Sequence, residues 1–184
     1  MGKYLKVMFG NKGANFEYKI DEVNIAKTWN INSNDPKEMG GFNFSTEDKI
    51  LRWLVRGDTL YDVIVPSNAE IIDCPSESAP HGVFRSNKII LKNPRKMTDK
   101  LAMEFYLKSN LPEKSYYKSL AGVAIMGYKN TCLRIINDKV NKDNIDLVLS
   151  EIDDFVKPYQ TNNKQDNKVY NEVISILNDI KNNK

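Results

Sequence analysis

Cysteine and histidine are scarce in this chain, which has two cysteines, Cys74 and Cys132, and one histidine, His81, in 184 residues. A secreted disulfide framework needs more thiols, and the usual four Cys or His ligands of a structural zinc site cannot be assembled from three residues. No apolar run approaches the roughly 20 residues of a membrane span, and the N-terminus has no signal-peptide core. We therefore expect an intracellular protein with reduced thiols, no membrane association, and no metal or other cofactor.

The chain also lacks a large excess of one charge, because it has 27 basic and 24 acidic residues and a net charge of +3. Dedicated nucleic-acid binders concentrate far more positive charge on one face. The hydrophobic share of 41% and the aromatic share of 10% suffice for a buried core, which excludes a wholly disordered chain. The length fits one domain, or one domain with a small appendage.

The first half of the chain shows the two-residue alternation of strands. The pattern predicts that 4–9 and 16–20 form a hairpin or two neighbouring strands, and that 30–39 is a loop. Phe42 and Phe44 share one side of a short strand, and Ser45 is expected to cap a helix that ends near Gly57. Further strands are predicted at 59–65, 70–73 and 83–91, with a loop at 75–82.

The period changes from two to 3.6 after Asn93-Pro94. Helices are predicted at 98–109 with Thr98 as the cap, at 115–126, at 129–140 and at 143–155. The apolar stripe of a final helix either docks on the body or pairs with a partner helix, and we favour docking. Because strands precede helices, the fold class is α+β, a small, mainly antiparallel twisted sheet with helices followed by a helical C-terminal part. The expected divisions are a sheet domain at 1–97, a helical part at 98–157, a linker at 158–168 and a helix at 169–184.

Several short blocks of the first half occur in an order that resembles a known viral domain. The blocks are Phe16-Glu17-Tyr18-Lys19, Asn24-Ile25, Gly40-Gly41-Phe42-Asn43-Phe44-Ser45-Thr46, Tyr61-Asp62-Val63 with Pro66, and Phe84-Arg85-Ser86-Asn87-Lys88-Ile89-Ile90-Leu91. Over about residues 4 to 92 they are similar to the domain that precedes the repeats in ankyrin-repeat proteins of mimivirus-like giant viruses. The resemblance implies a viral adaptor in the host cytoplasm of an infected cell or in the virion.

The second half contains one pattern that resembles part of an ankyrin unit. Leu120-Ala121, Ala124, Gly127-Tyr128 and Cys132-Leu133 are similar to its helix-turn-helix half, in which small residues let two helices approach closely. The Thr-Pro-Leu-His start is missing and no repeat array follows. An ordinary antiparallel helix pair explains the same residues.

A second resemblance concerns the strand that contains Phe42, Phe44, Ser45 and Thr46. It looks like a core element of ADP-ribosyltransferase folds, and the resemblance implies that these four residues would hold the nicotinamide end of NAD. The first-strand His or Arg of those enzymes is not evident here, and 83–91 contains no acidic residue to serve as the catalytic Glu. In the alternative interpretation, Ser45 caps a helix and the two phenylalanines fill the core.

Two other groups of residues are candidates for chemistry. His81 could act as a general base with Asp73, Glu77 or Ser78 beside it, although a lone loop histidine is usually only exposed or locally hydrogen-bonded. The densest basic run could contact phosphates, or it could be a solvated sheet edge protected by lysines. It consists of Arg85, Lys88, Lys92, Arg95, Lys96 and Lys100.

We predict from these patterns a non-enzymatic adaptor or host-interaction module that binds a protein partner. Its contact surface would combine the loop Cys74 to Gly82 with the helical pair from Ser115 to Val140. An ADP-ribosyltransferase-like NAD-binding domain and a nucleic-acid-binding protein that uses Arg85 to Lys100 are the alternatives. The oligomeric state is not indicated by the sequence.

Overall fold

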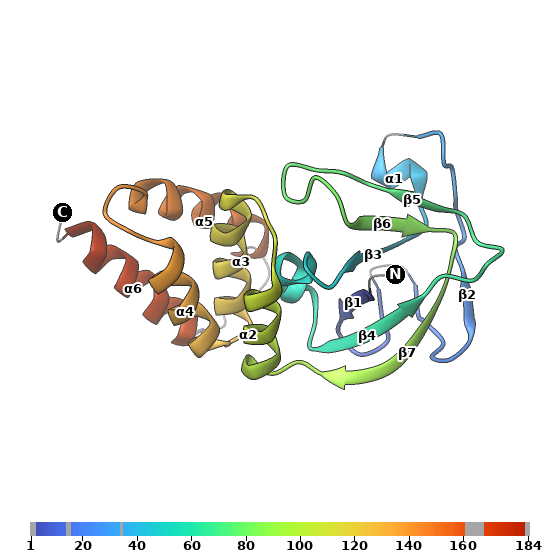
Figure 1. The fold of residues 1–184 in the computed structure, drawn as a ribbon, viewed down its shortest axis with the longest axis horizontal. Coiled ribbons are helices and arrows are strands. Elements are labelled where there is room, and N and C mark those ends of the chain that lie inside the picture. Colours follow the sequence, from blue (N-terminus) through green and yellow to red (C-terminus); the bar gives the residue numbers. More distant parts are fainter. Residues whose placement is uncertain (1–2, 14–15, 34, 161–167, 183–184) are drawn as a thin grey trace. The chain divides into compact units, whose positions relative to one another are not determined.

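The computed structural model describes residues 3–13, 16–33, 35–160 and 168–182. The chain divides into two compact units. The sheet unit contains Met1–Ile50 and Arg56–Met97, and the helical unit contains Leu51–Val55 and Thr98–Lys184. The strands lie in the N-terminal half and most of the helical residues in the C-terminal half, which confirms the predicted α+β class (Figure 1).

The sheet unit is built on one antiparallel sheet of seven strands in the order β2-β7-β4-β1-β3-β6-β5. β1 lies at its centre and pairs with β3 and β4, as Tyr4 is opposite both Thr46 and Val63. The strands are β1 (Tyr4–Met8), β2 (Val23–Ile25), β3 (Phe42–Thr46), β4 (Thr59–Ile64), β5 (Ile71–Asp73), β6 (Val83–Ser86) and β7 (Lys88–Lys96).

The sheet curls so that its two halves meet at Asn87. β6 and β7 belong to opposite halves of the strand order, yet this single residue separates them in the chain. Its backbone N–H donates to the Glu70 carbonyl at 3.3 Å, and its side-chain oxygen accepts from the Glu70 N–H at 2.9 Å. On the other side the Ala26 N–H donates to the Asn87 carbonyl at 2.9 Å. Asn87 thus joins the β5 margin to the β2 margin at one end of the sheet.

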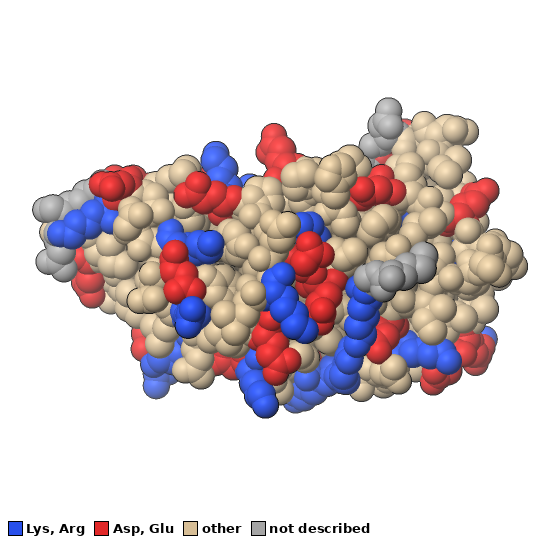
Figure 2. All heavy atoms as spheres, viewed as in Figure 1, with Lys and Arg blue, Asp and Glu red and all other residues tan. Residues whose placement is uncertain are grey.

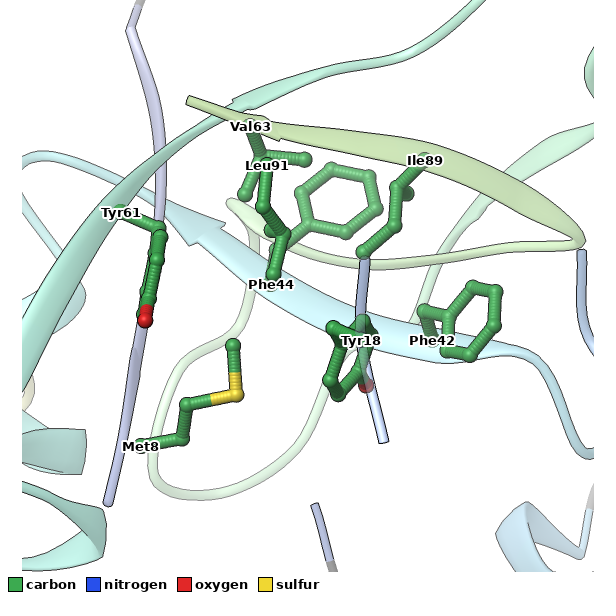
Figure 3. Packing of buried hydrophobic residues seen from close by; sticks show 8 residues of the cluster. All are labelled: Met8, Tyr18, Phe42, Phe44, Tyr61, Val63, Ile89 and Leu91. Atoms are coloured by element: carbon green, nitrogen blue, oxygen red, sulfur yellow. The ribbon is translucent and has the colours of Figure 1, made fainter. Parts of the chain in front are cut away.

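Aromatic and branched side chains fill the inside of this curl (Figure 3). Phe42 and Phe44 are each 4% exposed, and their alternation on β3 directs both toward the core, as predicted. Ring centroids lie 5.1 Å apart for Tyr4 and Phe44, and 4.9 Å apart for Phe16 and Phe42, in edge-on geometry. The cluster is Met8, Tyr18, Phe42, Phe44, Tyr61, Val63, Ile89 and Leu91.

Four local predictions for the sheet unit are wrong. The single strand expected at 83–91 is two strands, β6 and β7, which are not neighbours in the sheet. Residues 16–20 do not form a strand beside β1, and they make only isolated bridges, such as Ile20 with Leu91. Ser45 does not cap a helix, because β3 includes it and the following element is a 3-10 helix, η1 (Ile50–Arg56). The segment 30–39 is not wholly a loop, because the Asp35 side chain accepts from the Lys37 N–H and begins the short helix α1 (Pro36–Met39).

The helical unit contains five α-helices in its described part, besides the Leu51–Val55 part of η1, and the positions of the α-helices agree closely with the predicted ones. They are α2 (Asp99–Lys108), α3 (Glu113–Ile125), α4 (Lys129–Lys139), α5 (Ile145–Gln160) and α6 (Lys168–Asn182) (Figure 1). Most of the predicted linker, 161–167, lies outside the described residues. In the described part of the chain, no helix combines the length and the apolar composition that crossing a bilayer requires.

α3 is the central helix of this unit and packs against α4, α5 and α6. The C-terminal helix docks, as we favoured, with Val173 2% exposed and Leu177 fully buried. Asp99 of α2 caps α4 from outside, because its carboxylate accepts from the backbone N–H groups of Asn130 at 2.8 Å and Thr131 at 3.0 Å. Burial alone would raise the pKa of Asp99, but these hydrogen bonds outweigh it and hold the pKa below its ordinary value.

Candidate functional site

The residues that resemble an ADP-ribosyltransferase strand lie together on β3. The side chains of Phe42 and Phe44 are covered by other core side chains, and Ser45 is 1% exposed with its hydroxyl buried. The Thr46 hydroxyl donates to the Gly82 carbonyl at 3.3 Å. Packing of the core therefore accounts for both phenylalanines, and neither presents an open ring face to a nicotinamide.

His81 lies in the loop between β5 and β6, and its side chain is 86% exposed. Its Nδ1 is 3.3 Å from the Asp73 Oδ2, so of the three proposed neighbours Asp73 is in contact with the ring. General-base catalysis gains most where closure excludes water. The His81 ring has no such closure, and the pair forms a surface contact.

The predicted basic run is divided between the two units. Arg85 lies on β6 and Lys88, Lys92, Arg95 and Lys96 lie on β7, whereas Lys100 belongs to α2 of the helical unit. Arg95 contacts Asp62 at 2.5 Å and Lys92 lies 4.0 Å from Asp21, so acidic groups offset part of the charge. On the face seen in Figure 2, basic and acidic side chains are interspersed. That face therefore carries no continuous track of positive charge for a phosphate backbone.

The predicted protein-contact surface is divided in the same way. The loop Cys74 to Gly82 belongs to the sheet unit, and the helical pair belongs to the other unit. α3 is mostly buried, including Tyr117, Leu120 and Val123, so it offers little surface to a partner. The outer side of α4 is mainly polar, with Leu133 38% exposed. The better candidates lie elsewhere, in the sheet unit.

The first of these candidates is the free edge of β2, a strand that lies at one margin of the sheet (Figure 1). Asn24 lies opposite Ile89, and the Ala26 N–H bonds to Asn87, so the even-numbered residues bond inward to β7. Alternate residues of an antiparallel strand bond inward and outward. The backbone N–H and C=O groups of Val23 and Ile25 therefore point away from the sheet, and no backbone group among the described residues bonds to them.

The side chains beside this edge are apolar and partly exposed. Val23, Ile90 and Ile64 lie in register on β2, β7 and β4, which places them in one row on one face. Val23 is 48% exposed, Ile64 45%, and Ile25, two residues along β2, 61%. We call these four residues the apolar row. Sheet edges are usually protected by shortness, lysine, proline or a covering segment. β2 has only three residues, but Val23-Asn24-Ile25 contains neither lysine nor proline.

The second candidate is Lys6, a buried lysine of β1 that is 8% exposed. Its ammonium donates to the backbone carbonyl of Asn43 at 2.6 Å and to the Asn43 side-chain oxygen at 2.8 Å. Pairing of β1 with β3 ends at Leu5 and Ser45, so the ammonium bonds to β3 just beyond the last paired residues. Burial, and then repulsion by Arg56 and by Arg85, lowers the pKa of Lys6 from its ordinary 10.5 to about 7.

Sequence reasoning missed both candidates. β2 is three residues long and its partner lies more than sixty positions later, so only the apolar-polar-apolar order of Val23-Asn24-Ile25 pointed to it. Lys6 was visible as one lysine within Leu5-Lys6-Val7-Met8. A charged residue inside an apolar run is the sequence signal that indicates a buried lysine at this position.

The chain was compared with models of protein families, with curated proteins and with solved structures, and none of the three comparisons gives a match.

Proposed function

We propose that this protein is a non-enzymatic binding module that captures a strand-forming segment of another protein at the β2 edge. The single observation that carries the proposal is the outward direction of the Val23 and Ile25 backbone groups beside the exposed apolar row. An extended peptide bonded to these groups would add an eighth strand next to β2. The resemblance to a domain that precedes ankyrin repeats suggests a host or viral protein as the partner.

The backbone and side-chain groups of the β2 edge indicate which kind of peptide segment would bind there. Backbone hydrogen bonds supply affinity in this mode, and side chains at alternate positions supply specificity. Apolar residues at alternate positions would extend the apolar row beyond Val23 and Ile25. Asp21 and Glu22 precede β2 and Lys27 follows it closely, so a basic residue at one end of the segment and an acidic residue at the other would match the charges.

A library of displayed linear peptides tests the proposal without a known partner. We expect selection on the full chain to enrich segments with alternating apolar residues, and the Ile25→Lys substitution to weaken their binding by about tenfold or more. The matched control is Ile71→Lys, because Ile71 lies on β5 at the opposite margin and is 39% exposed. This control should leave binding unchanged.

Three outcomes would overturn the proposal. Selection could enrich no peptide, or Ile71→Lys could weaken binding while Ile25→Lys has no effect. The third outcome is concentration-dependent self-association of the chain, measured by sedimentation, that Ile25→Lys abolishes and no peptide competes with. That result would identify a second copy of the chain as the occupant of the edge.

A further inference from the structure

Lys6 is a buried cation whose contacts are with neutral groups. An ammonium has three N–H donors, and two of them bond to the oxygens of Asn43. The ring of Tyr18 lies 5.4 Å from the same nitrogen and supplies a weak cation–π contact. No carboxylate among the described residues lies within ion-pair distance of the Lys6 ammonium. Buried charges are ordinarily paired, so this arrangement lacks the anion that would complete it.

Two arginines lie close enough to Lys6 to act on it electrostatically. Arg85 on β6 is directly opposite Asn43 in the β3–β6 ladder, and its Nη1 donates to the Gly40 carbonyl at 2.5 Å. Arg56 ends η1. The charges of both arginines repel the Lys6 ammonium and lower its pKa, after burial, which has the larger effect. Asn43 of β3 is therefore bonded to Lys6 of β1 and lies opposite Arg85 of β6, the strands on either side of β3.

We propose that Lys6 and Arg85, which both lie beside Asn43, form a binding site for an oxyanion, the phosphate or carboxylate group of a ligand. The Lys6 ammonium supplies a desolvated point charge and its third N–H donor. Arginine presents a planar fork of N–H donors that matches the oxygens of phosphate and carboxylate. A bound oxyanion offsets the repulsion that the arginines exert on Lys6 and pairs with the ammonium charge that the fold has removed from water. This site is independent of the β2 edge.

Sulfate, phosphate and acetate at low ionic strength are the probes, with sodium chloride at matched ionic strength as the reference. Thermal unfolding of the full chain is measured at about pH 6, where Lys6 is protonated. We expect saturable stabilisation by the oxyanions beyond that by chloride. In Lys6→Met the binding should weaken by about tenfold or more, as expected for loss of a charge-assisted hydrogen bond. Lys96→Met, which removes an exposed lysine of the same unit, should bind as the wild type does.

The pattern across the probes identifies the ligand group. Stabilisation by sulfate and phosphate alone assigns the site to phosphate groups, and stabilisation by acetate as well assigns it to carboxylates too. Sulfate does not titrate near neutral pH, so its affinity should decrease as the pH rises through the pKa of Lys6, about 7. The proposal fails if no oxyanion exceeds chloride, if Lys6→Met binds like the wild type, or if the sulfate affinity is constant from pH 6 to about pH 9.

Discussion

Replacing Lys6 by methionine should stabilise the protein, and the gain should depend on pH. The fold lowers the pKa of Lys6 from 10.5 to about 7, chiefly through burial and then through repulsion by Arg56 and Arg85. Each pKa unit corresponds to 1.36 kcal/mol, so keeping the ammonium charged in the fold costs about 5 kcal/mol below pH 7. Native proteins are stable by only about 5–15 kcal/mol, so this cost is a large part of the total.

The direction of the pH dependence follows from proton binding. Between about pH 7 and pH 10.5 the unfolded chain binds more protons at this position than the folded chain does. The stability of the wild type therefore rises with pH across this window. Below about pH 7, the buried ammonium of Lys6 destabilises the fold most. Methionine has no such dependence. The advantage of Lys6→Met should fall by about 3 kcal/mol between about pH 6 and pH 9.

Urea unfolding of both proteins at the two pH values measures this difference. The two hydrogen bonds to Asn43 are lost in the variant at either pH, so the pH dependence of its advantage reports the titration of Lys6 in its bonded position. Lys96→Met is the control for removing a lysine charge from the surface, and its effect on stability should be similar at both pH values. An advantage of Lys6→Met that is the same at pH 6 and pH 9 would refute the burial of a titrating ammonium at this position.

Three further substitutions test the packing of the two units by urea unfolding. Asp99→Ala removes the cap of α4 and should lower the free energy of unfolding by about 1–2 kcal/mol at neutral pH. This loss should shrink as acid protonates the Asp99 carboxylate of the wild type. The control Asp153→Ala removes an exposed carboxylate and should cost about 0–1 kcal/mol. Gly57→Ala would place a methyl carbon 2.0 Å from a backbone carbon of β1 and should cost about 2 kcal/mol or more. Leu177→Ala should cost about 2–5 kcal/mol, and a cost near zero would show that α6 does not dock.

The helical half could be predicted closely because its signals are local. Thr98 accepts from the Leu101 N–H at 3.2 Å and begins α2 at the expected place. Gly127 has a φ of +81° and separates α3 from α4, as a reversal at this residue requires. The cap and the apolar stripe of a helix lie within a few residues of each other, so each helix can be predicted from its own segment of the sequence.

The sheet was less predictable because its pairing joins distant residues. The sequence predicts one strand over 83–91, yet the chain forms β6 and β7 there, and β7 continues past Asn93-Pro94 to Lys96. The register with β4 shifts between Leu60 and Asp62, and Asn93 has a φ of +51°, so a bulge accommodates the proline within the ladder. No local pattern shows that β7 will bulge at Asn93-Pro94 and then resume pairing with β4.

Ser45 shows how one residue type can mislead. Serine before a run of apolar residues is a common helix cap, and Asp48 three positions later strengthened that interpretation. The position lies instead inside β3, opposite Leu5 and Val83, where strand pairing on both sides fixes an extended backbone. Tertiary pairing thus overrides the local preference for a cap.

Both proposed sites lie where the sheet leaves backbone groups without a strand partner. The curl joins the two margins at Asn87, but on one margin the backbone groups of Val23 and Ile25 point outward, and no backbone group among the described residues bonds to them. On β3, pairing with β1 stops after Ser45, and the Lys6 ammonium bonds to the Asn43 carbonyl just beyond that point. An apolar side chain at position 6 would avoid burying a charge, so the lysine departs from the apolar residues Leu5, Val7 and Met8 beside it on β1. Departures of this kind from an otherwise consistent sequence are expected at functional positions, which is why oxyanion binding is the property to measure at Lys6.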